Sequence, residues 1–325
     1  MAADILPPRW KTLLAFGIIY FVWGSTFLAI RIGVHEVPPF LLAAMRFAVA
    51  GLVLYLWMLA RGERSPSRPQ WLSALLLATL IFVFDYGLLF WAEQRVPSGL
   101  AAVLLATIPV FMTLSEVLLL RTQHLTPRLT AALLLGIAGV VVLISRSLHL
   151  GGAPVDSAGA VALLIASLSW SVASVLTRKL PLPSSKVMSS GIQMLSGGVL
   201  LALASAALGE FGRFHPTQVS RAAWLGLIYL IVAGSIVGFT AYLWLIHHQS
   251  PTKVGTYAYV NPLVAVLLGH FAAGEPLDLR TALGTTCVLI SVVAITTAKQ
   301  DRSPATNRTE SLATRIAAPA PGPRE

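Results

Sequence analysis

The sequence predicts an all-α integral membrane protein in which ten transmembrane helices form two inverted five-helix repeats. Composition, long uncharged runs and an internal repeat are the observations that predict this fold. Of the 325 residues, 56% are hydrophobic and only 11% are charged, whereas about a quarter of the residues in soluble domains are charged. A soluble chain of this length would need more charge at its surface.

The apolar residues form runs as long as a bilayer requires. The run from Thr12 to Ile30 carries no charge, and Lys11 and Arg31 bracket it. A transmembrane helix needs roughly 20 mostly apolar residues. Strands of a membrane barrel would alternate in polarity, which these runs do not. The predicted spans are residues 12–31, 39–60, 71–92, 98–120, 129–146, 157–177, 187–208, 222–246, 254–274 and 281–298.

The residue types needed for metal, disulfide or nucleotide chemistry are sparse. Cys287 is the only cysteine, so neither an intrachain disulfide nor a cysteine-based metal site can form. His247 and His248 have no third metal ligand at a recognisable spacing. The sequence contains no Gly-x-x-x-x-Gly-Lys-Ser/Thr loop for nucleotide phosphates. We therefore expect no metal, no cofactor and no ATP hydrolysis by this chain.

The net charge of +10 indicates a membrane orientation better than a nucleic-acid partner, because the basic residues lie between the spans. Without the arginines of the C-terminal tail, twelve Lys and Arg fall on the side of the N-terminus and six on the other side. The positive-inside rule then places both termini, residues 1–11 and 299–325, in the cytoplasm of a cell whose inner (plasma) membrane holds the protein. The tail is rich in Pro, Ala, Ser and Arg, and we expect it to be disordered.

The two halves of the chain resemble each other, at an offset of 147 residues near their starts and 153 further on. Each half has an odd number of spans, so the second half, residues 157–298, must enter the membrane from the side opposite to the first, residues 12–146. Such inverted repeats are typical of transporters whose site lies between the halves near the midplane. A chance match between helices of similar composition is the alternative. The matched pairs are Trp23 with Trp170, Gly51 with Gly198, Trp71 with Trp224, Trp91 with Trp244 and Pro109 with Pro262.

Several residues inside the spans are candidates for a substrate cavity. Trp23 and Trp170 fall near the middle of their spans, outside the interfacial belt where Trp is enriched, so they either pack the core or line a cavity. Tyr257 and Asn261 are four residues apart and share one helical face. The expected cavity residues are Trp23, Arg46, Asp85, Trp170, Gln193, Tyr257 and Asn261.

Arg46 and Asp85 lie at similar depths in adjacent spans, so we expect them to form an ion pair. Their repeat equivalents, Gln193 and Gly238, are both uncharged, as expected if the two charges are kept or lost together. A pair of this kind either lines the cavity or braces the bundle. It would also hold Asp85 as a carboxylate and make it a poor proton carrier.

Two glutamates near span ends are expected to reach solvent. Glu116 lies near the end of its span, close to Arg121, and we expect it to extend to the interface. Glu93 follows the third predicted span, and we expect a solvated cap there. Neither residue is predicted to join the site.

Three stretches carry motifs that are specific in combination. They are Trp23–Phe27 followed by Arg31, Pro38-Pro39 and Arg46-Phe47; Pro97–Ala102 followed by Pro109; and Tyr257–Pro262 followed by Gly274–Leu277. They resemble the opening, the fourth helix and the ninth helix of the EamA-type transporters of the drug/metabolite transporter superfamily, in particular its YedA-like branch of permeases. The resemblance implies two EamA repeats, ten helices and movement of small organic metabolites, often outward. The chain departs from the family at residues 121–124, where the first repeat often carries a Gly-Glu pair.

The leading functional hypothesis is a secondary transporter. We expect it to export its solute, and the expected solute classes are amino acids, related metabolites or drugs. Its partners would be a small organic solute and the lipid bilayer, and a homodimer is one assembly compatible with the sequence. One alternative is a membrane scaffold without transport. Another is an intramembrane lipid-modifying enzyme, which would need a His and a carboxylate at motif spacing; we find none, assign no catalytic residue and expect no enzyme activity.

Overall fold

The computed structural model describes residues 8–96, 101, 104–148, 156–264 and 279–297. Within these ranges the chain is helical and contains no strand, which confirms the predicted all-α fold. The tail 299–325, predicted to be disordered, lies outside the described residues. So do residues 1–7 of the N-terminal segment and residues 265–274 of the ninth predicted span.

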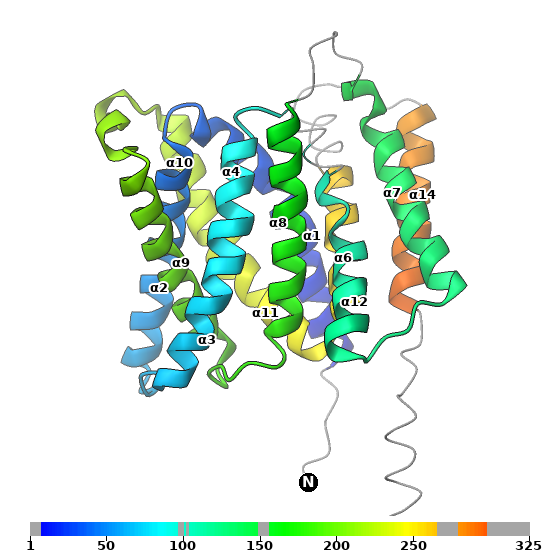
Figure 1. Cartoon of the computed structure of the whole chain (residues 1–325), viewed down its shortest axis with the longest axis horizontal. Coiled ribbons are helices and arrows are strands. Elements are labelled where there is room, and N and C mark those ends of the chain that lie inside the picture. The colour runs from blue at the N-terminus through cyan, green and yellow to red at the C-terminus, as the bar shows by residue number, and fades with distance from the viewer. Residues whose placement is uncertain (1–7, 97–100, 102–103, 149–155, 265–278, 298–325) are drawn as a thin grey trace, which may run out of the picture.

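The described helices correspond to all ten predicted spans (Figure 1). Six helices are long and apolar enough to cross a membrane, and the others are shorter or only partly described. The long helices are α1 (Arg9–Val34), α2 (Pro39–Ala60), the continuous α3, η1 and α4 (Arg68–Ala92), α8 (Ser157–Leu176), α9 (Lys186–Ala207) and the continuous α10, η5 and α11 (Arg221–His248). The others are α6 with η2 (Ile108–Leu120), α7 (Pro127–Leu148), α12 (Pro251–Val254) with the helical residues 257–264, and α14 (Leu279–Thr297).

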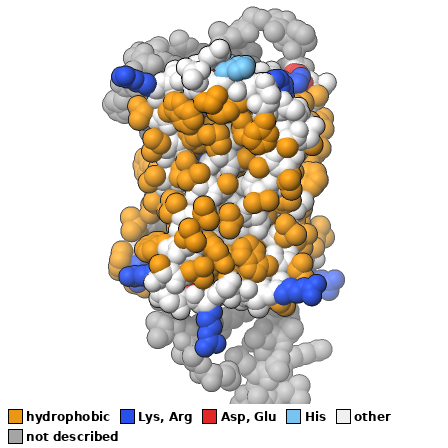
Figure 2. Space-filling view, turned by 90° about the vertical axis from the view of Figure 1, so that its left-hand side faces the viewer, with side chains coloured by type: hydrophobic (Ala, Val, Ile, Leu, Met, Phe, Trp, Pro, Cys, Tyr) orange, Lys and Arg blue, Asp and Glu red, His pale blue; other side chains and the backbone are white. Residues whose placement is uncertain are grey.

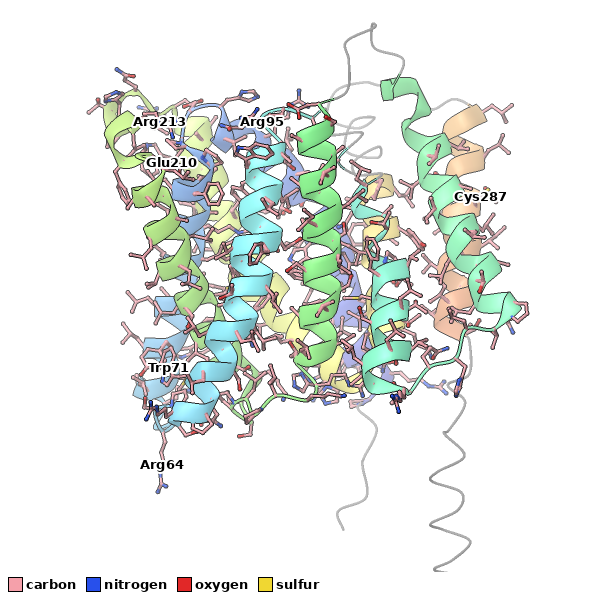
Figure 3. All side chains as sticks on the ribbon, in the orientation of Figure 1. Arg64, Trp71, Arg95, Glu210, Arg213 and Cys287 are labelled. Carbon is pink, nitrogen blue, oxygen red and sulfur yellow. The ribbon has the colours of Figure 1, made fainter. Side chains whose placement is uncertain are left out.

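The outer surface has the chemistry of a bilayer-spanning protein. Figure 2 shows apolar side chains over the middle of one face, with Lys and Arg gathered near its two ends. Large apolar side chains such as Leu14, Phe21 and Leu28 of α1 are more than half exposed, as lipid contact allows. Arg64 and Arg213 lie at opposite ends of the molecule, and α1 begins at the end that carries Arg64 (Figures 1 and 3). We call this end the N-terminal face.

Helices α2 and α9, which are the second helices of their repeats, pack against each other through glycine. A side chain at Gly51 would place its Cβ 2.2 Å from the Leu195 backbone nitrogen, and one at Gly198 would lie 2.3 Å from the Ala48 nitrogen. The two contacts are reciprocal, because Gly51 matches Gly198 and Ala48 matches Leu195 at the offset of 147. This reciprocity is what a two-fold axis between inverted repeats produces, and it brings the two backbones into direct contact.

The third and eighth spans share an unusual local structure at matching positions. Each changes from α-helix to π-helix near its middle, at η1 (Thr79–Gly87) and η5 (Leu230–Val237), and then returns to α-helix. π-Helical turns widen a helix and are frequent at functional sites. Both segments face the space between the repeats: η1 packs on α8, and η5 packs on α1 and α2.

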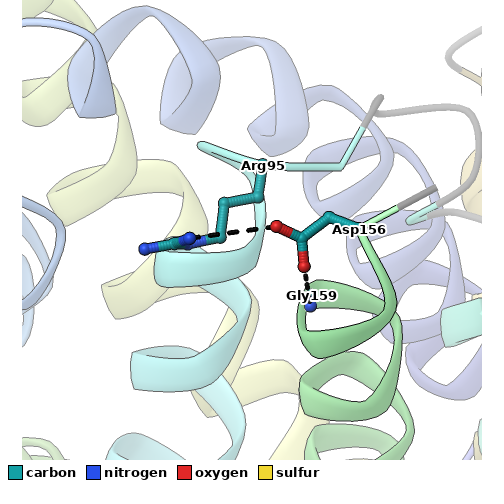
Figure 4. A network of polar contacts seen from close by, with 3 residues as sticks. All are labelled: Arg95, Asp156 and Gly159. Carbon is teal, nitrogen blue, oxygen red and sulfur yellow. Dashed lines mark hydrogen bonds and ion pairs between the residues drawn. The ribbon is translucent and has the colours of Figure 1, made fainter. Parts of the chain in front are cut away.

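Polar contacts join the two repeats at the face opposite the N-terminus. Arg95, after α4, forms an ion pair of 3.8 Å with Asp156, whose other oxygen accepts the Gly159 N–H at the start of α8 (Figure 4). Glu36, after α1, accepts both the backbone N–H and the hydroxyl of Ser220 at the start of α10, at 2.5 and 2.7 Å. In both contacts a carboxylate occupies a helix N-terminus, where it satisfies free N–H groups and faces the positive end of the helix dipole.

Candidate functional site

A central cavity lies between the two repeats. Its wall is formed by α1, the end of η1 and α4, residues 105–108, α8 and residues 257–262, so both halves of the chain contribute. The empty space amounts to about 570 Å³, open solvent at its mouth included. The cavity extends from Trp23 towards Ile30, and therefore away from the N-terminal face along α1.

Four aromatic rings form one wall of the cavity, and we call Trp23, Tyr86, Trp170 and Tyr257 the aromatic box. Trp23 meets Tyr257 edge to face at a centroid distance of 4.9 Å. Trp170 meets Tyr86 at 5.8 Å and Tyr257 at 6.4 Å, also edge to face. In each of these contacts the edge of one ring meets the face of the other, which is a favoured arrangement of aromatic pairs.

The two tryptophans are repeat equivalents, yet their indole nitrogens are held differently. The Trp23 Nε1–H donates to the carbonyl oxygen of Gly234 in η5, at 3.0 Å. Gly238 makes room for this indole, since a Cβ there would lie 2.5 Å from Trp23 Nε1. The Trp170 Nε1 is buried and has no hydrogen-bond acceptor among the described residues. Both tryptophans therefore pack in the core and line the cavity, so neither interpretation excludes the other.

Asp85 is the only acidic residue in the cavity wall among the described residues. Its side chain is 4% exposed, and within the described part of the chain its carboxylate forms no hydrogen bond and no ion pair. Asp85 thus presents a buried carboxylate, without a counter-ion, beside the aromatic box.

The predicted ion pair between Arg46 and Asp85 is wrong. The Arg46 Nε–H donates to the Ser235 hydroxyl at 2.8 Å, and the guanidinium lies over the rings of Phe47 and Tyr86 at 4.6 and 5.1 Å. Its electrostatic carboxylate partner is Glu93 rather than Asp85. Equal depth along two neighbouring helices does not fix the direction of the side chains, and Arg46 points towards η5 and lies outside the cavity wall.

Glu93 and Glu116 were both expected to reach solvent, and both are buried. Neither Glu93 carboxylate oxygen has a hydrogen-bond partner among the described residues, but Arg31 and Arg46 both act on it electrostatically. Glu116 is 0% exposed and accepts three hydrogen bonds within the described part of the chain. The prediction failed for Glu116 because its side chain turns inward to donors on α12 and on the residues after η2; no such donor accounts for the burial of Glu93.

Glu116 ties the two repeats together between the cavity and the N-terminal face. One carboxylate oxygen accepts the backbone N–H and the hydroxyl of Thr252 in α12, at 3.0 and 2.7 Å, and the other accepts the Thr122 hydroxyl at 3.1 Å. Deeper in the bundle, the Tyr20 and Thr256 hydroxyls bond at 2.7 Å. Thus η2 of the first repeat and α12 of the second repeat meet at this end of the molecule (Figure 1).

The remaining predicted site residues separate into two places. Tyr257 and Asn261 line the cavity. With its amide nitrogen facing two backbone carbonyls, Asn261 donates to Tyr257 O at 3.1 Å and Tyr20 O at 3.3 Å, and so joins this helix to α1. Gln193 is buried on α9, donates to Ser189 at 3.0 Å and does not line the cavity.

Sequence reasoning did not identify Tyr86, Tyr242 or Glu116 as parts of this region. Tyr86 directly follows Asp85 in the sequence, which is a signal that was available. Tyr242 supports Trp170 from behind at a centroid distance of 4.8 Å, and its hydroxyl bonds to that of Ser174. The described residues contain no group of three or more His, Cys, Asp or Glu side chains placed to hold a metal ion.

Together the fold and cavity define a membrane protein of ten helices, built from two inverted halves that enclose an aromatic cavity. Sequence comparison gives its family. The profile of the EamA-like transporter family matches residues 10–145 and 157–297, one match for each repeat, and the chain belongs to this family of membrane transporters.

Several curated relatives match most of the chain. The chain is 38% identical to "Uncharacterized inner membrane transporter YedA" of Escherichia coli K12, over 86% of this chain and 89% of that protein. It is 28% identical to an uncharacterized transporter of Archaeoglobus fulgidus, over 89% and 98% of the two chains, and 29% identical to protein PecM of Dickeya dadantii, over 84% and 88%. A crystal structure of another protein, 23% identical, covers 89% of this chain and 98% of its own with a TM-score of 0.71, which shows a shared fold.

Proposed function

We propose that the protein is a secondary transporter that moves a small organic solute across the inner membrane by alternating access, in the outward direction. The observation that carries this proposal is the aromatic cavity between two inverted repeats. A pocket between inverted repeats near the midplane is the usual site of a secondary transporter. The apolar wall and the few polar groups of this cavity suit a small organic molecule.

The contacts between the cavity and the N-terminal face support alternating access. Towards the N-terminal face, Glu116 binds Thr252 and Tyr20 binds Thr256. Gly255 packs closely in the same layer, where a Cβ would lie 2.8 Å from the Met112 sulfur. We take this arrangement as the state closed at the N-terminal face, and a transport cycle requires a second state in which these contacts open.

We further propose that the N-terminal face is cytoplasmic. The excess of Lys and Arg on that side of the predicted spans supports this orientation. In this orientation the cavity extends towards the outside, and a solute released from the described state would leave the cell.

The test compares the metabolites released by cells that express the protein with those released by cells that lack it, using untargeted mass spectrometry. Expression of Trp170→Ala at the same level is the variant control, since it opens the aromatic box. We expect one or a few compounds to accumulate outside only with the unaltered protein. If no compound differs, and if sealed vesicles containing the protein show no solute flux under any imposed gradient, a scaffold role replaces transport. A modified lipid product would point instead to an enzyme.

A further inference from the structure

The buried carboxylates differ in how they are compensated. Glu116 accepts three hydrogen bonds, and Glu210 accepts the backbone N–H of Leu41 at 2.9 Å. Glu93 has no hydrogen-bond partner among the described residues, but it does not line the cavity. Within the described residues, Asp85 has neither a cation nor a donor bonded to its carboxylate. An uncompensated carboxylate at membrane depth is costly, so its retention beside a cavity indicates a ligand that compensates it.

The surroundings of Asp85 select the kind of compensation. The aromatic box lines the same cavity as Asp85, and one of its members, Tyr86, directly follows Asp85 in the chain. Aromatic faces attract cations through the ring quadrupole, most strongly where water is excluded, and aromatic cages are the common protein site for substituted ammonium groups. A carboxylate beside such rings adds the counter-charge.

The rest of the cavity wall is compatible with an organic cation and not with a strongly hydrated one. No Lys, Arg or His lines the cavity among the described residues, so no fixed positive charge in the wall repels a cation. Arg46 does not line the cavity: its Nε–H donates to Ser235, and its guanidinium lies over the Tyr86 ring at 5.1 Å. Ile30, Leu89, Leu105 and Ile108 supply apolar surface for the carbon groups of the ligand.

The second repeat has no equivalent site. Gly238 occupies the position that matches Asp85, and the Trp23 indole fills the space beside it. The charge is therefore present on only one side of the two-fold axis, next to Trp170, the tryptophan whose Nε1 has no acceptor among the described residues. The asymmetry fits one ligand with one positively charged end.

We propose that the cavity binds an organic cation, a protonated or quaternary amine, with Asp85 as its counter-ion and the aromatic box as its cage. The inference deepens the proposed function and rests on it only for the statement that this cation is the transported solute. Binding itself does not depend on transport. A carboxylate that only carried protons would not need aromatic neighbours. The four rings that line the same cavity would instead contribute to the binding of an organic cation.

The test measures binding by isothermal titration calorimetry on the purified full-length protein in detergent. The probes are choline, tetraethylammonium and phenyltrimethylammonium, with 3,3-dimethylbutan-1-ol as the neutral isostere of choline. We expect at least one cation to bind, choline to bind at least about tenfold more tightly than its isostere if it is that cation, and Asp85→Asn to weaken cation binding at least about tenfold. Glu63→Gln, an exposed carboxylate between α2 and α3, should leave binding unchanged.

A second variant guards against a folding defect in Asp85→Asn. Tyr257→Leu removes one ring and keeps the carboxylate, and we expect several-fold weaker cation binding with unchanged elution on size exclusion. The inference is overturned if none of the three cations binds, or if binding is the same in Asp85→Asn. It is also overturned if Asp85→Asn removes only the pH dependence of solute flux, because Asp85 would then carry a proton alone. Cation binding without flux would contradict the proposed transport and leave the cation site standing.

Discussion

The indole rings of Trp23 and Trp170, equivalent positions of the two repeats, meet edge to face at the centre of the molecule with their centroids 5.5 Å apart and their planes at 80°. The local two-fold axis therefore passes close to this pair. The symmetry does not extend to the residue beside each tryptophan. Gly238 of the second repeat packs against Trp23, whereas the equivalent position of the first repeat is Asp85. The scaffold of the cavity is shared by the two halves, and its charge belongs to one half.

The reciprocal glycines of α2 and α9 give a prediction about stability. Gly51→Ala and Gly198→Ala should each lower the free energy of unfolding by about 1–3 kcal/mol, because the new methyl group would overlap a backbone atom of the other helix. The two effects should be similar, since the contacts are related by the two-fold axis. Gly17→Ala is the control: no atom lies within 4 Å of its Cβ position. Thermal unfolding in detergent measures all three, and a harmless Gly51→Ala would contradict the close contact.

The contact between Glu116 and Thr252 predicts which state is populated. Glu116→Gln replaces a charged acceptor, and hydrogen bonds to charged groups contribute about 1.5–3 kcal/mol. We expect the closed arrangement at the N-terminal face to lose population several-fold. Leu105→Cys in a Cys287→Ser background reports this change, because Leu105 lines the cavity and Cys287 is the only native cysteine (Figure 3).

In that assay a membrane-impermeant thiol reagent is added from the side opposite the N-terminal face. Labelling of Leu105→Cys should slow several-fold when Glu116→Gln is added. Glu63→Gln in the same background serves as the control and should not alter the rate. An unchanged rate in Glu116→Gln would remove Glu116 from the closure.

Coupling energies can test whether Arg46 interacts more strongly with Glu93 or with Asp85. A double-mutant cycle of Arg46→Gln with Glu93→Gln should give a coupling energy of about 1 kcal/mol or more, because Arg46 Nη1 and both Glu93 oxygens are buried and have no hydrogen-bond partner among the described residues. The cycle of Arg46→Gln with Asp85→Asn should give a smaller coupling, below about 0.5 kcal/mol. Unfolding in detergent is the measurement. A larger coupling for Asp85 than for Glu93 would restore the ion pair that the structure lacks.

Glu36 predicts a pH dependence at the face opposite the N-terminus. Hydrogen bonds from the Ser220 backbone N–H and hydroxyl lower the pKa of Glu36 below its ordinary value. Because the folded-state pKa is lowered, the contact stabilises the protein above the unfolded pKa of about 4.3 and is lost as the pH falls through the folded value. Unfolding temperatures from pH 7 to about pH 3 should fall less steeply for Glu36→Gln. If the unfolding temperature falls equally steeply with pH in the unaltered protein and in Glu36→Gln, the contact between Glu36 and Ser220 does not contribute to stability.

Topology gives a prediction that needs no purified protein. Gly62 lies between α2 and α3, next to Arg64, and Gly212 lies in η3 (Phe211–Arg213), at the opposite end of the molecule (Figure 3). Reporter fusions truncated after Gly62 should be active as cytoplasmic reporters, and fusions after Gly212 as external reporters. The same side for both would refute the number of spans, whereas an exchange of sides would refute only the orientation.

The sequence was sufficient for the helices, because each span is an unbroken apolar run and Trp, Gly and Pro recur at fixed offsets. It could also bring Trp23, Trp170, Tyr257 and Asn261 to one cavity, since repeat symmetry and helical spacing locate a face. It could not pair the charges. Whether Arg46 meets Asp85 or Glu93 depends on helix rotation, and the π-helical turns of η1 and η5 change that rotation without a recognisable sequence signal.

The glycine contact between α2 and α9 also has a mechanical consequence. Helices separated by a layer of side chains can slide by small rotamer changes, whereas helices whose backbones touch have no such layer to deform. The pair α2–α9 would therefore move as one rigid body during the transport cycle. Opening at the N-terminal face must then come from movement of η2, α12 and their neighbours relative to this rigid pair. Substitutions that change the transport rate should therefore cluster on the moving helices.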